Sequence, residues 1–295
     1  ATQKGRPTGS SFKPFVLASA FEKGFVPADQ INGIGTCEFD NPGGFPNPYE
    51  ANNFGGPESG SVATLRSQTL ASSNCAYLRL GLTVGLSNVA ETTEALGVTT
   101  DLSDLPISMP LGPKDITPLE MATAYATFAN DGLQVDPIFI ERVEDGDGTV
   151  LFENTPATER AISVQSARLV NQVLEANVRG GTGTRARLEN QVAAGKTGTA
   201  EVDLKADTSL FAAYGPVYRP GSAVAPDTVP EVALSVVMEE SGFGSASAAP
   251  VAAAIFEHLA TDTVPVARSL NKSARYALGL IDDDGQTVTG EGVNG

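Results

Sequence analysis

The sequence predicts an α/β (α+β) fold in which an antiparallel sheet is flanked by helices and adjoins an all-helical part. Three apolar segments, at 192–202, 209–218 and 231–240, are separated by turns rather than by helices. This order favours an antiparallel meander over βαβ units. Helical spacing or helix-end signals mark five further segments, namely 10–24, 61–97, 117–132, 163–178 and 247–260.

The first predicted helix begins at Ser10 and ends before Gly24, which supplies a C-terminal stop. Pro14 fits only in the first turn of this helix. Ser10 and Lys13 then lie three residues apart on one face. Residues 27–60 are rich in Gly, Pro and Asn, and they predict a long surface excursion without regular structure.

The strongest local helix signal covers 117–132. Thr117 is the expected N-cap, Pro118 occupies the first turn, and Glu120 completes a capping box. A β-hairpin is expected around Asp147-Gly148, where two apolar segments flank the turn. A helix over 163–178 follows it.

The chain is interpreted as one domain over 1–261 and an acidic, Gly-rich tail or linker over 262–295. It begins without Met and without the apolar core of a signal peptide. We therefore expect a fragment of a longer protein. Any membrane anchor is expected in a missing upstream segment, because no stretch approaches the roughly 20 apolar residues that cross a bilayer.

Composition excludes several classes of function. The formal net charge of −16 disfavours nucleic acid and anionic lipid as partners. One histidine and two cysteines give too few ligands for a typical zinc site, so neither a metal nor a cofactor is expected. Two separately packed thiols are favoured over a disulfide between Cys37 and Cys75, although a bridge remains an open alternative.

Three short motifs follow one another in the chain. Ser10 and Lys13 form S-x-x-K, Ser72 and Asn74 form S-x-N, and Lys196-Thr197-Gly198-Thr199 form K-T-G-T. Each motif is weak evidence by itself, since Ser10 can be an N-cap and Lys13 a solvated charge. The three motifs are informative together. They occur in a fixed order, the first at a helix start, the second beside a helix and the third on a strand.

These residue types suit nucleophilic catalysis without histidine. A serine hydroxyl needs a base to take its proton, and Lys13 can serve if burial and a nearby cation such as Lys196 lower its pKa. A helix N-terminus favours developing negative charge at Ser10. Gly198 is expected to leave room for a substrate that pairs along the strand edge.

The three motifs resemble those of the transpeptidase domain of penicillin-binding proteins, in the superfamily that includes serine β-lactamases. The resemblance covers roughly residues 1–260 and leaves class A and class B both open. It implies a β-lactamase/transpeptidase-like fold whose N-terminal strands are missing here. It also implies an extracytoplasmic location at the bacterial cell membrane and a role in peptidoglycan synthesis.

The resemblance further implies an acyl-enzyme at Ser10, formed with stem peptides that end in D-Ala-D-Ala and with β-lactams. Lys13 would be the general base, and Ser72 and Lys196 would handle proton transfer and the substrate carboxylate together with Thr197 and Thr199. Asn74 would hold a substrate amide. The N–H groups of Ser10 and Thr199 would form the oxyanion hole.

Four alternatives stay open at this point. A β-lactamase needs a base for water, and Glu120 lacks the Asn four residues later that class A enzymes have, since residue 124 is Ala. A D,D-carboxypeptidase would use water as acceptor. A non-catalytic β-lactam sensor would need no turnover. A P-loop nucleotide binder would use Gly195-Lys196-Thr197, but Asn190 stands where the first glycine belongs.

Overall fold

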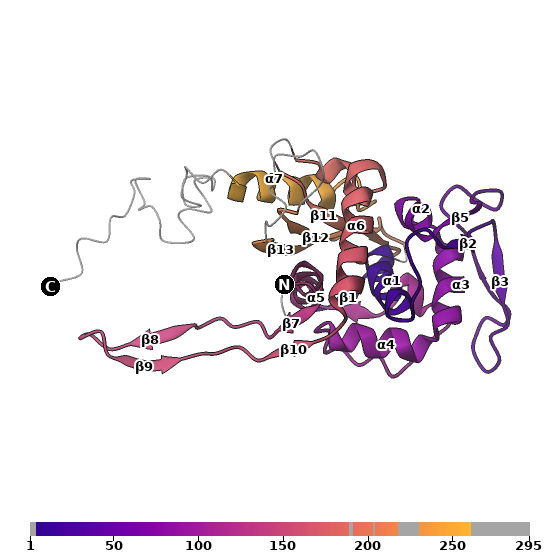
Figure 1. Ribbon diagram of the computed structural model, residues 1–295. Coiled ribbons are helices and arrows are strands. Elements are labelled where there is room, and N and C mark those ends of the chain that lie inside the picture. The colour runs from indigo at the N-terminus through magenta and orange to yellow at the C-terminus, as the bar shows by residue number, and fades with distance from the viewer. Residues whose placement is uncertain (1–3, 189–190, 203, 218–229, 261–295) are drawn as a thin grey trace.

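An antiparallel sheet forms one layer of the computed structural model, which describes residues 4–188, 191–202, 204–217 and 230–260. Its strand order is β11 (Ala194–Ala200), β12 (Thr208–Gly215) and β13 (Val232–Met238). Both strand pairs are antiparallel. Helix α7 (Ala248–Ala260) lies over the sheet and α5 (Pro118–Ala129) lies beneath it (Figure 1). The predicted meander and its covering helix are confirmed.

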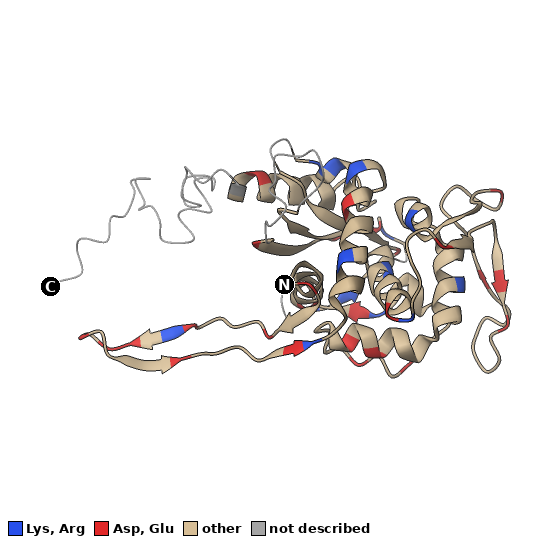
Figure 2. Cartoon of the chain, viewed as in Figure 1, with Lys and Arg blue, Asp and Glu red and all other residues tan. Residues whose placement is uncertain are grey.

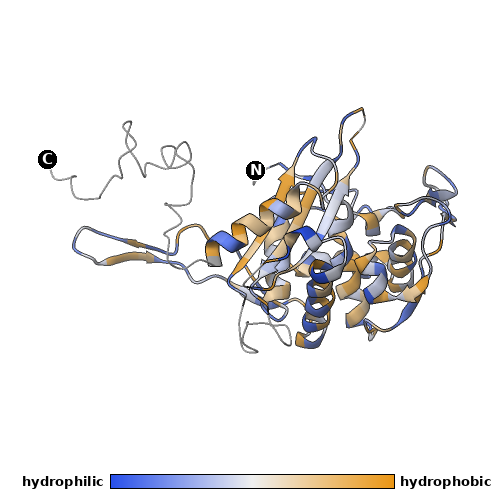
Figure 3. Ribbon diagram, turned by 90° about the horizontal axis from the view of Figure 1, so that it is seen from above, coloured by the Kyte–Doolittle hydropathy of each residue, from blue (hydrophilic) through white to orange (hydrophobic). Residues whose placement is uncertain are grey.

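Strand β12 shows why the sheet needs a helix on each face. Its residues are buried throughout, and neighbouring side chains join different apolar clusters. Phe211 packs in the cluster that contains Phe256 of α7, whereas Tyr214 packs in the cluster that contains Tyr125 of α5. This alternation follows from the two-residue period of a strand. Seen from above, α7 lies across the sheet (Figure 3), and its buried residues Ala252 and Phe256 share a cluster with Phe211.

The helical part surrounds one central helix. A 3₁₀ turn, η1 (Gly9–Phe12), leads into α1 (Lys13–Glu22), in which every residue from Lys13 to Phe21 is buried. The helices around it are α2 (Leu65–Leu70), α3 (Asn74–Val84), α4 (Leu86–Ala95) and α6 (Val164–Gly180). Two further 3₁₀ turns are η2 (Met109–Leu111) and η3 (Thr184–Ala186).

The predicted helix ends hold in most places. Thr117 and Glu120 form the expected capping box at the start of α5, and Gly24 has the left-handed φ of +89° that suits a helix stop. The helical segment predicted from Ser61 begins later, because residues 62–64 form strand β5 (Val62–Thr64), which pairs with β2 (Gln30–Asn32).

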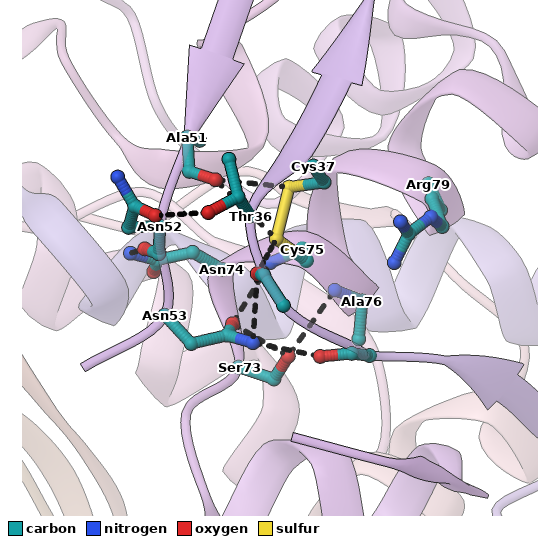
Figure 4. Close-up of a disulfide and its surroundings, with 12 residues drawn as sticks. Thr36, Cys37, Ala51, Asn52, Asn53, Ser73, Asn74, Cys75, Ala76 and Arg79 are labelled. Carbon is teal, nitrogen blue, oxygen red and sulfur yellow. Dashed lines mark hydrogen bonds between the residues drawn. A yellow bond between two sulfur atoms is a disulfide. The ribbon is translucent and has the colours of Figure 1, made fainter. Parts of the chain in front are cut away.

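The excursion at 27–60 is more regular than its composition predicts. Besides β2, it contains the hairpin of β3 (Cys37–Phe39) and β4 (Tyr49–Ala51). The favoured interpretation of Cys37 and Cys75 as separate thiols is wrong: they form a disulfide that joins β3 to the first turn of α3 (Figure 4). Their Cα atoms are 5.6 Å apart although 38 residues separate them in sequence, and sequence distance conceals such long-range proximity.

A long β-arm projects from the body of the molecule. Strands β8 (Arg142–Glu144) and β9 (Val150–Glu153) form the predicted hairpin around Asp147-Gly148. Its base is a second pair that was not predicted, β7 (Leu133–Val135) with β10 (Thr158–Arg160). The arm extends away from the helices and carries mainly acidic charges (Figures 1 and 2).

One more strand pair lies beside η1, where β1 (Arg6–Pro7) pairs with β6 (Asp115–Ile116). The predicted acidic tail at 262–295 lies outside the described residues. Within the described ranges, no helix has the length and apolar character needed to cross a membrane.

Candidate active site

The structure brings all three motifs together around two buried lysines. Lys13 lies at the start of α1 with a side chain that is 0% exposed. Its Nζ donates to the carbonyl oxygen of Ser72 at 2.6 Å and to Oδ1 of Asn74 at 2.8 Å. Its distance to Ser72 Oγ is 3.4 Å. A neutral amine has two N–H donors, so the two short bonds leave its lone pair free to accept a proton.

Lys196 reaches the same serine from the sheet. It belongs to β11 and is also 0% exposed. Its Nζ donates to Ser72 Oγ at 2.9 Å and to its neighbour's carbonyl, Thr197 O, at 3.1 Å. Ser72 therefore bridges the two lysines, as the motifs predict.

The local backbone explains why Ser72 stands between the lysines. Helix α2 ends at Leu70, and α3 begins at Asn74 with Ser73 as its N-cap, whose Oγ accepts from Ala76 N at 3.2 Å. Ser72 lies in the turn between them with a φ of +55°. Left-handed conformations of residues other than glycine cost energy and cluster at functional sites.

Strand β11 lies directly against the turn that carries Ser10. A Cβ at Gly9 would meet the carbonyl oxygen of Thr199 at 2.2 Å, and one at Gly198 would meet that of Thr8 at 2.4 Å. Both positions therefore need glycine. At Gly198 the strand and the turn approach too closely for a side chain, while the expected room for a substrate stays a prediction.

Ser10 lies half-buried in η1, three residues before Lys13. The N–H groups in the first turn of a helix lack partners within the helix, so that of Ser10 is available beside the Thr199 backbone. A direct hydrogen bond between Ser10 Oγ and Lys13 Nζ, which the motif spacing predicts, is not present among the described residues. Lys13 instead directs its hydrogen bonds to Ser72 and Asn74.

Burial sets the protonation of both lysines. Desolvation, followed by the charge of Lys196, lowers the pKa of Lys13 well below its ordinary value. Desolvation also lowers the pKa of Lys196 to about 7. Lys13 can therefore be neutral near physiological pH and able to accept a proton, while Lys196 retains a proton on much of the protein near neutral pH.

A threonine outside the three motifs completes the polar lining. Thr182, which follows α6, accepts a 2.7 Å hydrogen bond from Thr197 Oγ1 and lies 3.5 Å from Lys196 Nζ. The sequence around it is Gly-Gly-Thr-Gly-Thr at 180–184, and none of these residues was predicted to belong to the site. A hydroxyl residue in a glycine-rich turn just before the K-T-G-T strand was the available signal.

This geometry removes support from two alternatives, the P-loop nucleotide binder and a β-lactamase that uses Glu120 as its base. Lys196 lies within a strand rather than in a loop before a helix, so the P-loop interpretation is wrong. Glu120 is engaged by Thr99, Thr100 and Thr117. Burial raises its pKa, but these hydrogen bonds outweigh burial and lower it to about 2. Within the described ranges, no three His, Cys, Asp or Glu side chains gather as metal ligands.

Sequence comparison gives the family. The model of the penicillin binding protein transpeptidase domain matches residues 1–257. Penicillin-binding protein 1A of Aquifex aeolicus (strain VF5) is 34% identical over 196 residues, which are 66% of this chain and 26% of that protein. Penicillin-binding protein 2D of Bacillus subtilis (strain 168) is 29% identical over 68% of this chain and 30% of its own length. The chain belongs to the penicillin-binding protein transpeptidase domain family.

Solved structures show the same fold. Penicillin-binding protein A from M. tuberculosis, as an imipenem acyl-enzyme complex, has a TM-score of 0.71 at 23% identity and covers 87% of this chain and 60% of its own. Penicillin-Binding Protein 1A from Haemophilus influenzae has a TM-score of 0.73 at 22% identity, over 90% of this chain and 43% of its own. The chain spans about a quarter to a third of the length of the curated relatives.

Proposed function

We propose that this domain is a serine D,D-transpeptidase that cross-links peptidoglycan stem peptides and is acylated by β-lactams. The observation that carries the proposal is the chain of contacts Lys13–Ser72–Lys196, in which the Nζ atoms of the two buried lysines lie 3.4 and 2.9 Å from Ser72 Oγ. Such a chain moves protons without histidine. The family, and the imipenem acyl-enzyme of penicillin-binding protein A from M. tuberculosis, support the same chemistry.

In the proposed reaction, Ser10 Oγ attacks the carbonyl carbon of the penultimate D-Ala. Lys13 Nζ takes the hydroxyl proton on its free lone pair. The oxygen of the tetrahedral intermediate would accept from the N–H groups of Ser10 and Thr199. Gly9, which precedes Ser10, lies directly against the Thr199 backbone.

Collapse of the intermediate breaks the peptide bond and expels the terminal D-Ala. The departing nitrogen takes a proton from the Ser72 hydroxyl, which is replenished from Lys13. The C-terminal carboxylate is held by protonated Lys196 and by the hydroxyls of Thr197 and Thr199. An amine of a second stem peptide then attacks the acyl-enzyme, with proton transfers in the opposite direction.

The proposed substrate places the domain on the cell-wall side of the bacterial membrane. The catalytic residues are Ser10, Lys13, Ser72, Asn74 and Lys196, and the substrate-binding residues are Thr197, Gly198 and Thr199. In this assignment Asn74 contacts Lys13 through Oδ1 and Asn52 O through Nδ2, at 2.8 Å each. It therefore orients the base.

Labelling with a fluorescent penicillin tests the proposal. Wild type should form a stable covalent adduct, and Ser10→Ala should form none. The rate at which the adduct is lost separates the related reactions. Release within seconds would indicate a β-lactamase and would overturn the proposal, as would absence of wild-type labelling. Release of D-Ala to water without cross-link formation from stem peptides would indicate a D,D-carboxypeptidase.

A further inference from the structure

Residues 27–64, here called the bracing segment, contact the S-x-N motif through two adjacent asparagines. Asn52 and Asn53 follow β4 directly. Asn53 is only 7% exposed, although glycine-rich turns surround it. A buried amide needs partners for its oxygen and its nitrogen, and the partners of Asn53 lie on both sides of a junction.

One side of the Asn53 amide binds the start of α3. Its Oδ1 accepts from Ser73 Oγ at 3.0 Å and from Cys75 N at 3.1 Å. The other side binds the bracing segment, because Nδ2 donates to Gly33 O at 2.7 Å and to Ser59 O at 3.3 Å. Figure 4 shows the amide pointing at Ser73. One side chain thus joins two turns of the bracing segment to the motif.

The bonded residue lies between the two functional members of the motif. Ser73 is the middle residue of S-x-N and the N-cap of α3. Its position fixes the direction in which Ser72 and Asn74 point, since they are its chain neighbours. The backbone of Asn52 adds a second bond, because its carbonyl accepts from Asn74 Nδ2 at 2.8 Å and leaves Asn74 Oδ1 to face Lys13.

We propose that Asn53 is a positioning residue of the active site, which touches no substrate and holds Ser72 and Asn74 against Lys13 through Ser73 and the N–H of Cys75. The proposal rests on the acyl-transfer function proposed above. Its physical basis is that acid–base groups must stay within about 3 Å of their partners, and small displacements cost orders of magnitude in rate.

A covalent bond connects the same two parts of the chain as the Asn53 amide. The disulfide between Cys37 and Cys75 joins the same bracing segment to the same turn of α3. The two links constrain one junction, so their effects are not additive. With the disulfide closed, loss of the Asn53 side chain is partly compensated. With the disulfide open, the amide is the main remaining bond from this segment to Ser73.

The main experiment measures acylation of the intact chain by a penicillin, separated into binding of the drug and the first-order acylation step. For Asn53→Ala we expect acylation to slow about 10-fold to 100-fold with binding changed less than 3-fold. Asn53→Ala and Ser73→Ala each remove one partner of the same hydrogen bond. The acylation rate of the double variant should therefore fall far less than the product of the two single reductions. Ser73→Thr keeps the hydroxyl and should therefore retain most of the wild-type acylation rate.

The pH dependence of the acylation rate distinguishes a positioning role of Asn53 from a general loss of folded protein. If Ser72 and Asn74 move away from Lys13, water reaches its amine, its pKa rises toward the ordinary value, and the ascending limb of the acylation rate moves to higher pH. The charged group that faces Lys13 is Lys196, and the ring of Tyr77 lies 5.4 Å away. A loss of folded protein would lower the rate equally at every pH.

Asn41→Ala is the matched control. Asn41 lies in the same segment, but its side-chain nitrogen donates to Pro46 O, within the turn between β3 and β4, rather than to the S-x-N motif. We expect its acylation rate within 2-fold of wild type. Opening the disulfide with dithiothreitol should slow wild type by less than 5-fold and Asn53→Ala by more than 10-fold.

Three results would overturn the inference. The first is acylation of Asn53→Ala at the wild-type rate. The second is slower acylation of Asn53→Ala with the ascending limb of its pH profile at the wild-type position. The third is a double variant with Ser73→Ala whose rate falls by the full product of the two single reductions. Failure of wild type to acylate would instead overturn the proposed function itself, so the two failures are distinguishable.

Discussion

Lys196 Nζ lies 2.9 Å from Ser72 Oγ, and this contact joins the sheet to the helical part at the centre of the site. The two residues are 124 positions apart in sequence. Each half of the fold therefore supplies one end of the proton path, and the proposed chemistry exists only when both halves are assembled.

The acylation rate should depend on pH with a bell shape. It rises as Lys13 loses its proton, because only the neutral amine accepts the proton of Ser10. It falls around and above pH 7 as Lys196, whose pKa is lowered to about 7, loses the charge that binds carboxylate. Stopped-flow acylation of wild type and Lys196→Arg provides the measurement. Arginine keeps its charge, so the descending limb should disappear below pH 9 in a variant about 10-fold slower; an unchanged limb would contradict the assignment.

Stability should increase with pH above neutrality. The folded-state pKa of Lys196 is about 7, whereas its ordinary value is 10.5. Between these values the unfolded chain binds more protons than the folded one, so raising the pH favours folding. Urea unfolding at pH 7 and pH 9 should show a larger gain for wild type than for Lys196→Met. Equal gains would show that Lys196 is not desolvated.

Gly198→Ala should disrupt the contact between the strand and the nucleophile turn. The added methyl would lie 2.4 Å from the Thr8 carbonyl oxygen, which is backbone and must move. We expect acylation to fall more than 100-fold and the unfolding free energy to fall by about 1–3 kcal/mol, as for other overpacked sites. Acylation kinetics and urea unfolding measure the two effects. Gly146→Ala, in open space at the arm tip, is the control.

Thr182→Val should weaken binding of the substrate carboxylate. It removes the hydroxyl that accepts from Thr197 Oγ1 at 2.7 Å and leaves the buried hydroxyl of Thr197 without that partner. A lost buried hydrogen bond costs about 1–3 kcal/mol, equivalent to roughly 5-fold to 150-fold in second-order acylation. Thr182→Ser keeps the hydroxyl and should stay within 3-fold of wild type. Equal effects of both variants would show that the hydroxyl does not determine the role of this position.

Replacing the disulfide by Cys37→Ser with Cys75→Ser should destabilise the fold more than the chemistry. The bridge closes a loop over a separation of 38 residues, and loops of this size contribute about 2–4 kcal/mol through the unfolded state. Urea unfolding should show this loss, while acylation at 20 °C should fall less than 5-fold because Asn53 still holds Ser73. Unchanged stability would show that the bridge does not form.

The sequence predicts the reacting groups better than it predicts what holds them. Ser10, Lys13, Ser72 and Lys196 are recognisable because catalysis fixes their types and local spacing. Asn53 and Thr182 were missed because their roles come from contacts across the fold, with partners 20 and 15 residues away. The bridge between Cys37 and Cys75 was misjudged for the same reason.

Sequence rules that act over a few residues identified some positions correctly, although not always for the complete structural reason. The capping box at Thr117 and Glu120 is confirmed because both partners lie within one helical turn. Gly198 was identified as a special position, but its constraint comes from Thr8 on another element. Short-range chemistry can thus be inferred from sequence, whereas close approach between elements requires coordinates.

The β8–β9 arm has a practical consequence. Its tip at 145–148 is exposed and projects away from the helices and the sheet (Figure 1). Extra residues there would extend into solvent without displacing packed groups. A peptide tag or fluorescent reporter inserted between Gly146 and Asp147 would therefore label the protein while leaving the proposed catalytic groups untouched.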